Sequence, residues 1–301
     1  MKRFAKWVGI GFGGFVVLII AAFAVIYLAS SSRINKLHQI ALLDVVIQSD
    51  SAAIERGHHA ARIRGCADCH GEDYGGGVFL DDPAMGRLIA TNLTAGEGGI
   101  GGGYTDADWV RAIRHGVGPE GRALLFMPSY EYYPMSDEDL GSMIAYLKSL
   151  PPVDRQLPAS KVGPMGRALL LAGQFPLLPA EMIDHDAPRS QPPEVGPTAE
   201  YGAYLAATCT GCHGPNYSGG KIPGTPPVFP EAANITPHES GILGWTRAEF
   251  VAAVQEGKAR DGRTFEPQFM PWPNFRHMTD VEIEALWQYI QTLPPREYGN
   301  R

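Results

Sequence analysis

The pentapeptide CADCH at residues 66–70 recurs as CTGCH at residues 209–213, so that the chain carries the same motif twice. Other landmarks recur in the same order at the same or nearly the same spacing. They are Asn92-Leu93-Thr94 with Asn234-Ile235-Thr236, Met127-Pro128 with Met270-Pro271, and Leu150-Pro151-Pro152 with Leu293-Pro294-Pro295. Agreement at so many points indicates one unit present twice, a two-domain tandem rather than a solenoid array.

Length and composition fit two compact domains. The chain has 301 residues, of which 45% are hydrophobic and 19% charged, which excludes a disordered chain. Its 36 glycines and 25 prolines indicate long, turn-rich loops. The formal net charge of -7 argues against a nucleic-acid binder, and four cysteines are too few for a disulfide scaffold.

The N-terminus predicts a membrane anchor. Basic residues precede the apolar, uncharged run Trp7–Ala29, which as a helix is long enough to cross a hydrocarbon core of about 30 Å. The positive charge before the run places residues 1–6 in the cytoplasm and everything from Ser30 onward outside it, in a bacterial periplasm or its equivalent. A cleaved signal peptide with a site near Ala29-Ser30-Ser31 is the alternative.

The helix signals predict an all-α fold with few strands. In each copy a Thr or Ser three residues before an acidic residue opens a helix, as at Thr105 and Thr246, and at Ser136 and Thr279. Glycines or prolines close these helices, and one more helix leads into each CxxCH motif. The expected division is residues 1–29 for the cytoplasmic tip and anchor, 30–50 for a linker, 51–153 for the first domain, 154–196 for a connector with one short packed helix, and 197–301 for the second domain.

The CxxCH motif is the covalent attachment signature of c-type haem. Two thiols on one helical turn reach the two vinyl groups of one porphyrin edge, and the following histidine ligates the iron. Zinc would need further ligands at close spacing, and a redox CxxC pair does not require the adjacent histidine. We therefore expect two covalent haems c, held by Cys66, Cys69 and His70 and by Cys209, Cys212 and His213.

A methionine is the expected second axial ligand, since haem electron carriers commonly pair His with Met. Met127 and Met270 follow the first cysteine of their motif at the same spacing, and each precedes a stiffening proline. Met135 and Met278 are a rival pair, but each precedes a helix cap, where an apolar residue serves as a hydrophobic staple. Six other histidines have no counterpart in the other copy, and we expect them at the surface: His58, His59, His115, His185, His238 and His277.

Several polar residues near the motifs are candidates for contacts to the haem propionates. Asn92 and Asn234 are expected either to bond a propionate or to fix a loop. Tyr104 and Trp245 could donate a hydrogen bond to a propionate or simply pack in the core, and Arg122 with Arg263 could offset its charge.

With CxxCH, Asn-Leu/Ile-Thr, Met-Pro and a closing Leu-Pro-Pro in this order, residues 51–153 and 197–296 each resemble a class I cytochrome c domain. The tandem resembles the cytochrome c subunits of bacterial membrane dehydrogenases, such as those serving alcohol or gluconate dehydrogenases, which carry three such domains. The resemblance implies an all-α fold around each haem and a carrier role.

These expectations describe a membrane-anchored di-haem protein with no activity of its own. It would carry electrons from a quinol-oxidising complex or dehydrogenase to a soluble cytochrome or terminal oxidase, and its acidic balance suggests a basic partner face. A di-haem peroxidase-like enzyme would need one open distal site, against which the matched Met-Pro argues. A fixed electron-wiring subunit of a larger complex differs from a tethered carrier only in degree.

Overall fold

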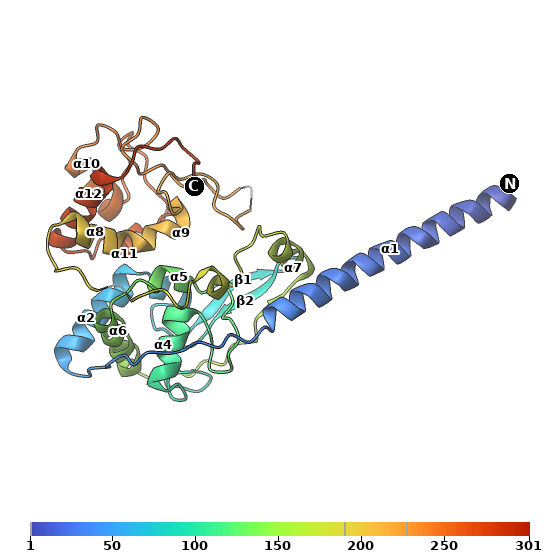
Figure 1. Cartoon of the computed structure of the whole chain (residues 1–301), viewed down its shortest axis with the longest axis horizontal. Helices are drawn as coiled ribbons and strands as arrows, with labels where there is room; N and C mark the ends of the chain where they lie inside the picture. Colours follow the sequence, from blue (N-terminus) through green and yellow to red (C-terminus); the bar gives the residue numbers. More distant parts are fainter. Residues whose placement is uncertain (1, 190, 227) are drawn as a thin grey trace.

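The computed structural model describes residues 2–189, 191–226 and 228–301. A long helix, α1 (Lys2–Ile34), projects from two helical lobes that lie side by side (Figure 1). Among the described residues it is the one helix long and apolar enough to cross a membrane, a property it shares with signal sequences. The helix runs past Ala29 through Ile34, because Ser30–Arg33 contains neither glycine nor proline to stop it.

The two lobes repeat one arrangement of helices. The first contains α2 (Ser51–Ile63), α3 (Cys66–His70), α4 (Asp106–His115), α5 (Ser129–Tyr132) and α6 (Asp137–Ser149). The second contains α8 (Ala199–Ala206), the 3-10 turn η2 (Ala207–Cys209), α9 (Thr210–His213), α10 (Arg247–Glu256), α11 (Trp272–Phe275) and α12 (Asp280–Thr292). In each lobe the first helix packs on the last, α2 on α6 and α8 on α12.

A glycine lets each of these helix pairs approach closely. A Cβ on Gly57 would lie 1.9 Å from the carbonyl oxygen of Ser142, and a Cβ on Gly202 would lie 2.0 Å from that of Ala285. Ser142 and Ala285 are equivalent in the repeat. The backbone of one helix therefore rests directly on the other, which fixes the frame of each lobe.

The predicted helix boundaries are largely confirmed. Thr105, Thr246 and Thr279 each form a reciprocal capping box, and Gly116 and Gly257 end their helices in the left-handed conformation. Ser136 accepts from the Asp139 N–H, but the return bond of that capping box is absent, for a reason described with the site below.

The prediction of an all-helical fold needs one correction. A small antiparallel sheet in the order β1-β2-β3 joins β1 (Gly77–Asp82), β2 (Gly86–Ala90) and β3 (Lys161–Val162). These strands show no clean alternation of buried and exposed residues, and β1 carries an irregularity between Val78 and Leu80. Periodicity in the sequence therefore could not reveal them.

The connector packs on the first lobe, as expected. It supplies β3, the predicted short helix α7 (Pro164–Leu171) and the 3-10 turn η1 (Pro179–Met182). Its side chains share a buried cluster with first-lobe residues such as Leu88 and Val117. The segment after α1 is also held down, because His38 N–H donates to the Gly121 carbonyl at 2.7 Å. Neither segment is a free linker.

Candidate haem sites

The two CxxCH motifs form one short helical turn each, α3 and η2–α9, with half-buried side chains. All four cysteines are unpaired thiols. Burial raises the pKa of Cys66 and of Cys209 to about 12, and Arg64 partly offsets both shifts. Burial also raises the pKa of Cys69 to about 11. These protonated thiols differ from the activated thiolates of a redox pair.

Each motif histidine is oriented by a backbone carbonyl. His70 Nδ1 lies 2.7 Å from the Thr91 oxygen, and His213 Nδ1 lies 2.7 Å from the Ala233 oxygen. Nδ1 therefore carries the proton, and Nε2 is left as a lone-pair donor to a metal. Burial lowers the pKa of both histidines, which favours the neutral form that ligation requires.

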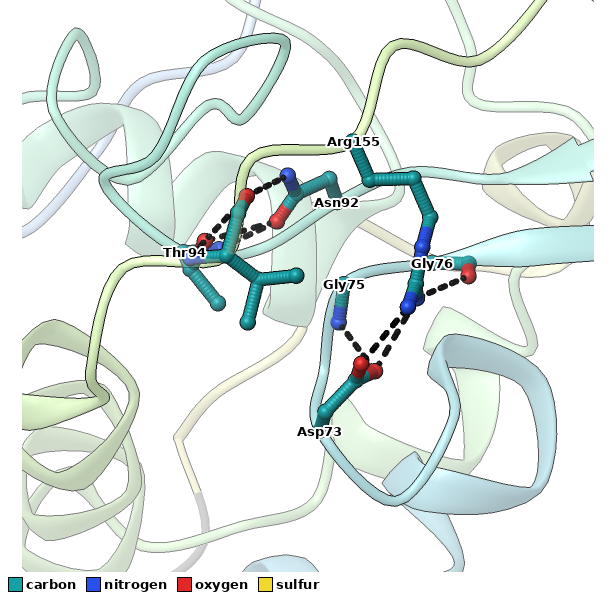
Figure 2. Close-up of polar contacts among 7 residues, drawn as sticks. Asp73, Gly75, Gly76, Asn92, Thr94 and Arg155 are labelled. Atoms are coloured by element: carbon teal, nitrogen blue, oxygen red, sulfur yellow. Dashed lines mark hydrogen bonds and ion pairs between the residues drawn. The ribbon is translucent and has the colours of Figure 1, made fainter.

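The recurring asparagines hold the loops that carry these carbonyls. Asn92 is fully buried; its amide donates to the Val153 carbonyl at 2.7 Å, and its Oδ1 accepts from the N–H and hydroxyl of Thr94 (Figure 2). Asn234 repeats the pattern with Arg296 and Thr236. Of the two roles considered for these asparagines, the contacts fit the fixing of a loop.

A further contact in the first lobe involves the loop that follows His70. Arg155 of the connector pairs with Asp73 at 2.7 Å and donates to the Gly76 carbonyl at 3.1 Å (Figure 2). It thereby fastens the connector to the segment that follows His70.

The two methionine pairs differ in their surroundings. Met127 and Met270 are half-buried at the edge of their lobe's core. Met135 and Met278 are 2% and 6% exposed, inside the same cores and just before the caps of α6 and α12. The second pair therefore has the burial of a hydrophobic staple.

The other propionate candidates differ in their contacts. Tyr104 packs edge-on against Trp109 with ring centroids 5.4 Å apart, and Trp245 packs at the edge of the second core. Arg263 is largely exposed and pairs with its neighbour Asp261, and Arg122 is also exposed. Core packing accounts for the aromatic residues, and Arg263 is engaged elsewhere.

Two family models match the chain, one in each lobe. The model for cytochrome c matches residues 199–294, and the model for cytochrome C oxidase, cbb3-type, subunit III matches residues 52–147. The chain carries two cytochrome c domains in tandem. Two half-buried free thiols and a neutral histidine with a free Nε2 fit a covalently bound haem in each domain.

Curated relatives extend over most of the chain. The cytochrome c subunit of alcohol dehydrogenase (quinone) from Gluconacetobacter polyoxogenes is 26% identical over 82% of this chain and 57% of its own length. The fructose dehydrogenase cytochrome subunit from Gluconobacter japonicus is 28% identical over 81% and 53%. A diheme cytochrome c-type protein from Cereibacter sphaeroides is 26% identical over 80% and 86%. The chain thus spans a little over half the length of the dehydrogenase subunits.

The two cytochrome c domains dock reciprocally at their attachment motifs. Asn274 of α11 donates to Asp68, in the first CxxCH motif, at 2.6 Å. Glu131 of α5 lies against Gly211, in the second motif, where a Cβ would be 2.1 Å from its carboxylate. Glu131 and Asn274 occupy equivalent positions in the repeat, as do Asp68 and Gly211. The short helix after each Met-Pro therefore touches the other domain's motif.

Charged and aromatic side chains fill this interface. Arg64, which is 9% exposed, lies over the Tyr204 ring of the other domain at 5.5 Å. Burial raises the pKa of Glu131 to about 8, and Tyr130 and Arg64 partly offset that shift.

The acidic residue of each last helix also bonds to the other domain. Tyr204 of α8 donates to Asp139 and accepts from the Ser136 N–H at 3.0 Å. The Tyr204 hydroxyl therefore lies between the Ser136 N–H and the Asp139 carboxylate, in place of the direct bond that would complete the capping box. His59 of α2 pairs in the same way with Glu282 at 2.8 Å. Asp139 and Glu282 are equivalent in the repeat, so the pattern is again reciprocal.

The expectation that the unmatched histidines are surface residues is wrong for two of them. His59 belongs to the interface just described. His115 is 6% exposed and its Nδ1 lies 3.0 Å from that of His185, because the connector covers the end of α4. For His115, the lack of a counterpart in the second domain was the available signal, since the connector that covers it lies outside the repeat.

Proposed function

We propose that the protein is a membrane-anchored di-haem c-type cytochrome. It carries electrons from a quinol-oxidising complex or dehydrogenase to a downstream cytochrome or oxidase. The observation that carries this proposal is the presence of two matched attachment motifs, each touched by the other domain through Asp68 with Asn274 and Gly211 with Glu131. Such docking suits transfer of an electron within one molecule.

Equivalent residues would have the same roles toward the haem in both domains. Bound haem supplies a reversible one-electron carrier. The cysteines would hold it through thioether bonds, His70 or His213 would give Nε2 to the iron, and Met127 or Met270 would give its sulfur from the other side. Ligation by both a histidine and a methionine would leave the iron no site for a substrate, which would fit a carrier better than a peroxidase-like enzyme.

The contacts of the anchor favour a fixed subunit over a freely swinging carrier. Arg33, at the end of α1, pairs with Glu181 of the connector at 2.6 Å and donates to the Leu170 carbonyl at 3.0 Å. The haem domains are thus held at one orientation to the helix. The similarity to dehydrogenase cytochrome subunits favours a dehydrogenase complex as the partner.

The proposed location is the inner membrane, with both domains on the extracytoplasmic side. The basic residues before the apolar run set this orientation, and haem is attached to CxxCH motifs outside the cytoplasm. Purification from membranes in mild detergent tests the partner. A dehydrogenase that stays bound through gel filtration supports the subunit, whereas a cytochrome that elutes alone supports the tethered carrier.

The axial ligands are tested by low-temperature EPR with near-infrared magnetic circular dichroism on the purified ferric protein. Two low-spin His/Met centres are expected. One high-spin centre, with turnover of peroxide, would overturn the carrier function in favour of an enzyme.

A further inference from the structure

The connector helix α7 lies along the last turns of the anchor helix. The first-turn residue Pro164, with Val162 just before it, lines an apolar groove with Phe23 and Ile26 of α1. One turn later the Arg167 guanidinium lies over the Tyr27 ring at 4.4 Å and donates to the hydroxyls of Ser30 and Ser31.

The two helices therefore run in the same direction. Leu170, near the end of α7, is level with Arg33, which donates to its carbonyl. Moving back toward the start of α7 means moving back along α1, past Tyr27 and toward Phe23. Figure 1 shows α7 at the edge of the first domain from which α1 leaves.

This alignment fixes the level of the start of α7 relative to the apolar run of α1. The apolar run of α1 ends at Ala29, six residues after Phe23 and thus about 9 Å further along a helix that rises 1.5 Å per residue. If α1 spans the bilayer, Val162 and Pro164 reach the level of its last apolar turns. Tyr27 marks the interface there, where aromatic rings are favoured.

The side chains at this end of α7 suit lipid. Met165 is 50% exposed, and Pro164, Leu171 and Ala172 are also exposed, so the open face of the helix carries no charged side chain. The one charged residue of α7, Arg167, is turned onto α1, and its position beside Tyr27 is that of a side chain whose charge reaches the headgroups.

The acidic side chains near the start of α7 have hydrogen-bond or ion-pair partners, and the exposed lysine there is basic. At the end of β1, Asp81 pairs with Arg87 of β2 at 2.9 Å, and Asp82 accepts from the N–H groups of Ala84 and Met85 in the turn between the two strands. Lys161 is exposed beside the turn, where a cation attracts anionic headgroups.

We propose that the segment Val162–Met165 inserts into the interface of the phospholipid bilayer beside α1. The anchor and the connector then enter the membrane together, and the haem domains sit at a fixed height and tilt above it. This inference rests on the proposed membrane anchor, and its partner is the lipid surface itself.

The test uses the full-length holoprotein in vesicles of phosphatidylcholine and phosphatidylglycerol. Its four native cysteines are expected to be bound in thioethers, so a single added cysteine takes a nitroxide label. Three variants are compared: Met165→Cys at the start of α7, Phe15→Cys in the middle of α1 and Val281→Cys on α12. Power saturation with oxygen or with a nickel chelate reports lipid or water around each label.

We expect the labels at 165 and 15 to be more accessible to oxygen and the label at 281 to be more accessible to nickel. A water-exposed label at 165 with a lipid-exposed label at 15 would overturn the inference while leaving the anchor in place. A water-exposed label at 15 would overturn the anchor and the inference with it. A label at 165 shielded from both reagents would overturn the inference by showing a protein contact, such as a second copy, in place of lipid.

Discussion

At the scale of single residues, the sequence marks the side chains of the CxxCH motifs but not the backbone groups that orient them. The CxxCH residues stand out in the sequence, because haem attachment chemistry fixes both their type and their spacing. The carbonyls of Thr91 and Ala233, which orient the motif histidines, could not be, because any residue supplies a backbone oxygen. Only the recurrence of Asn92 and Asn234 pointed to that loop.

Replacing Asn92 by alanine should destabilise the first domain by about 2 kcal/mol or more. The change removes the bond to Val153 and leaves the buried N–H of Thr94 without its acceptor, and one unsatisfied buried group costs about 1–3 kcal/mol. Denaturant unfolding measures the loss, with Asn216→Ala as the control because Asn216 makes an exposed contact. Equal stability of the two variants would contradict the loop-fixing role.

Replacing Met127 or Met270 by alanine should lower the midpoint potential of the haem in that domain and leave its attachment intact. Loss of the thioether removes the ligand that favours ferrous iron. The matched controls are Met135→Leu and Met278→Leu, which should each cost less than about 1.5 kcal/mol and leave both potentials unchanged. Redox titration decides the ligand. Unchanged potentials in the alanine variants would return that role to the buried pair.

At the scale of elements, caps were predictable and contacts between elements were not. Thr105, Thr246 and Thr279 mark their helices locally, since a hydroxyl and an acid three residues apart satisfy the free N–H groups of a helix start. The β1–β2 pair shows no clean alternation of buried and exposed residues, and β3 is added from the connector, so no local pattern indicates this sheet. The glycines at the helix crossings likewise carried no signal in the sequence.

Gly202→Ala should destabilise the second domain by about 1–3 kcal/mol. The new Cβ would lie 2.0 Å from a backbone carbonyl of α12, so the helices must separate, and this overpacking outweighs the gain of about 1 kcal/mol that alanine brings to a helix. Gly77→Ala is the control, because nothing lies within 4 Å of its Cβ. Thermal unfolding of the two variants should separate them, and a neutral Gly202→Ala would contradict the close crossing.

At the scale of the whole molecule, the tandem was predictable from the sequence and the docking of its domains was not. The repeat fixes which residues are equivalent, but it says nothing of where one copy lies against the other. Glu131, Asn274, Tyr204 and His59 carry no motif, and they acquire a role only because each domain presents its attachment motif and its last helix to the other. The contact between Arg33 at the end of α1 and Glu181 joins segments far apart in the chain and was equally unpredictable.

The His59–Glu282 pair should make the docking of the domains depend on pH. The hydrogen bond to Glu282 raises the pKa of His59 above 6.5, against the effect of burial. The pKa of Glu282 is lowered below 4.5, since bonds from His59 and Thr279 outweigh its burial. The histidine thus stabilises the folded pair fully below pH 6.5 and loses its effect as pH rises through its raised pKa. The glutamate stabilises the pair above pH 4.5 and loses its effect as pH falls through its lowered pKa.

The contribution of the pair is therefore largest between pH 4.5 and 6.5. Unfolding of the wild type and of His59→Gln, followed across pH 4 to about 9, should give stability curves that differ most in that window and converge as pH rises. His238→Gln is the control, since His238 makes only an exposed contact within its own loop. A constant offset between wild type and His59→Gln at every pH would mean that the imidazole acts by packing alone, and the charge pairing across the interface would be refuted.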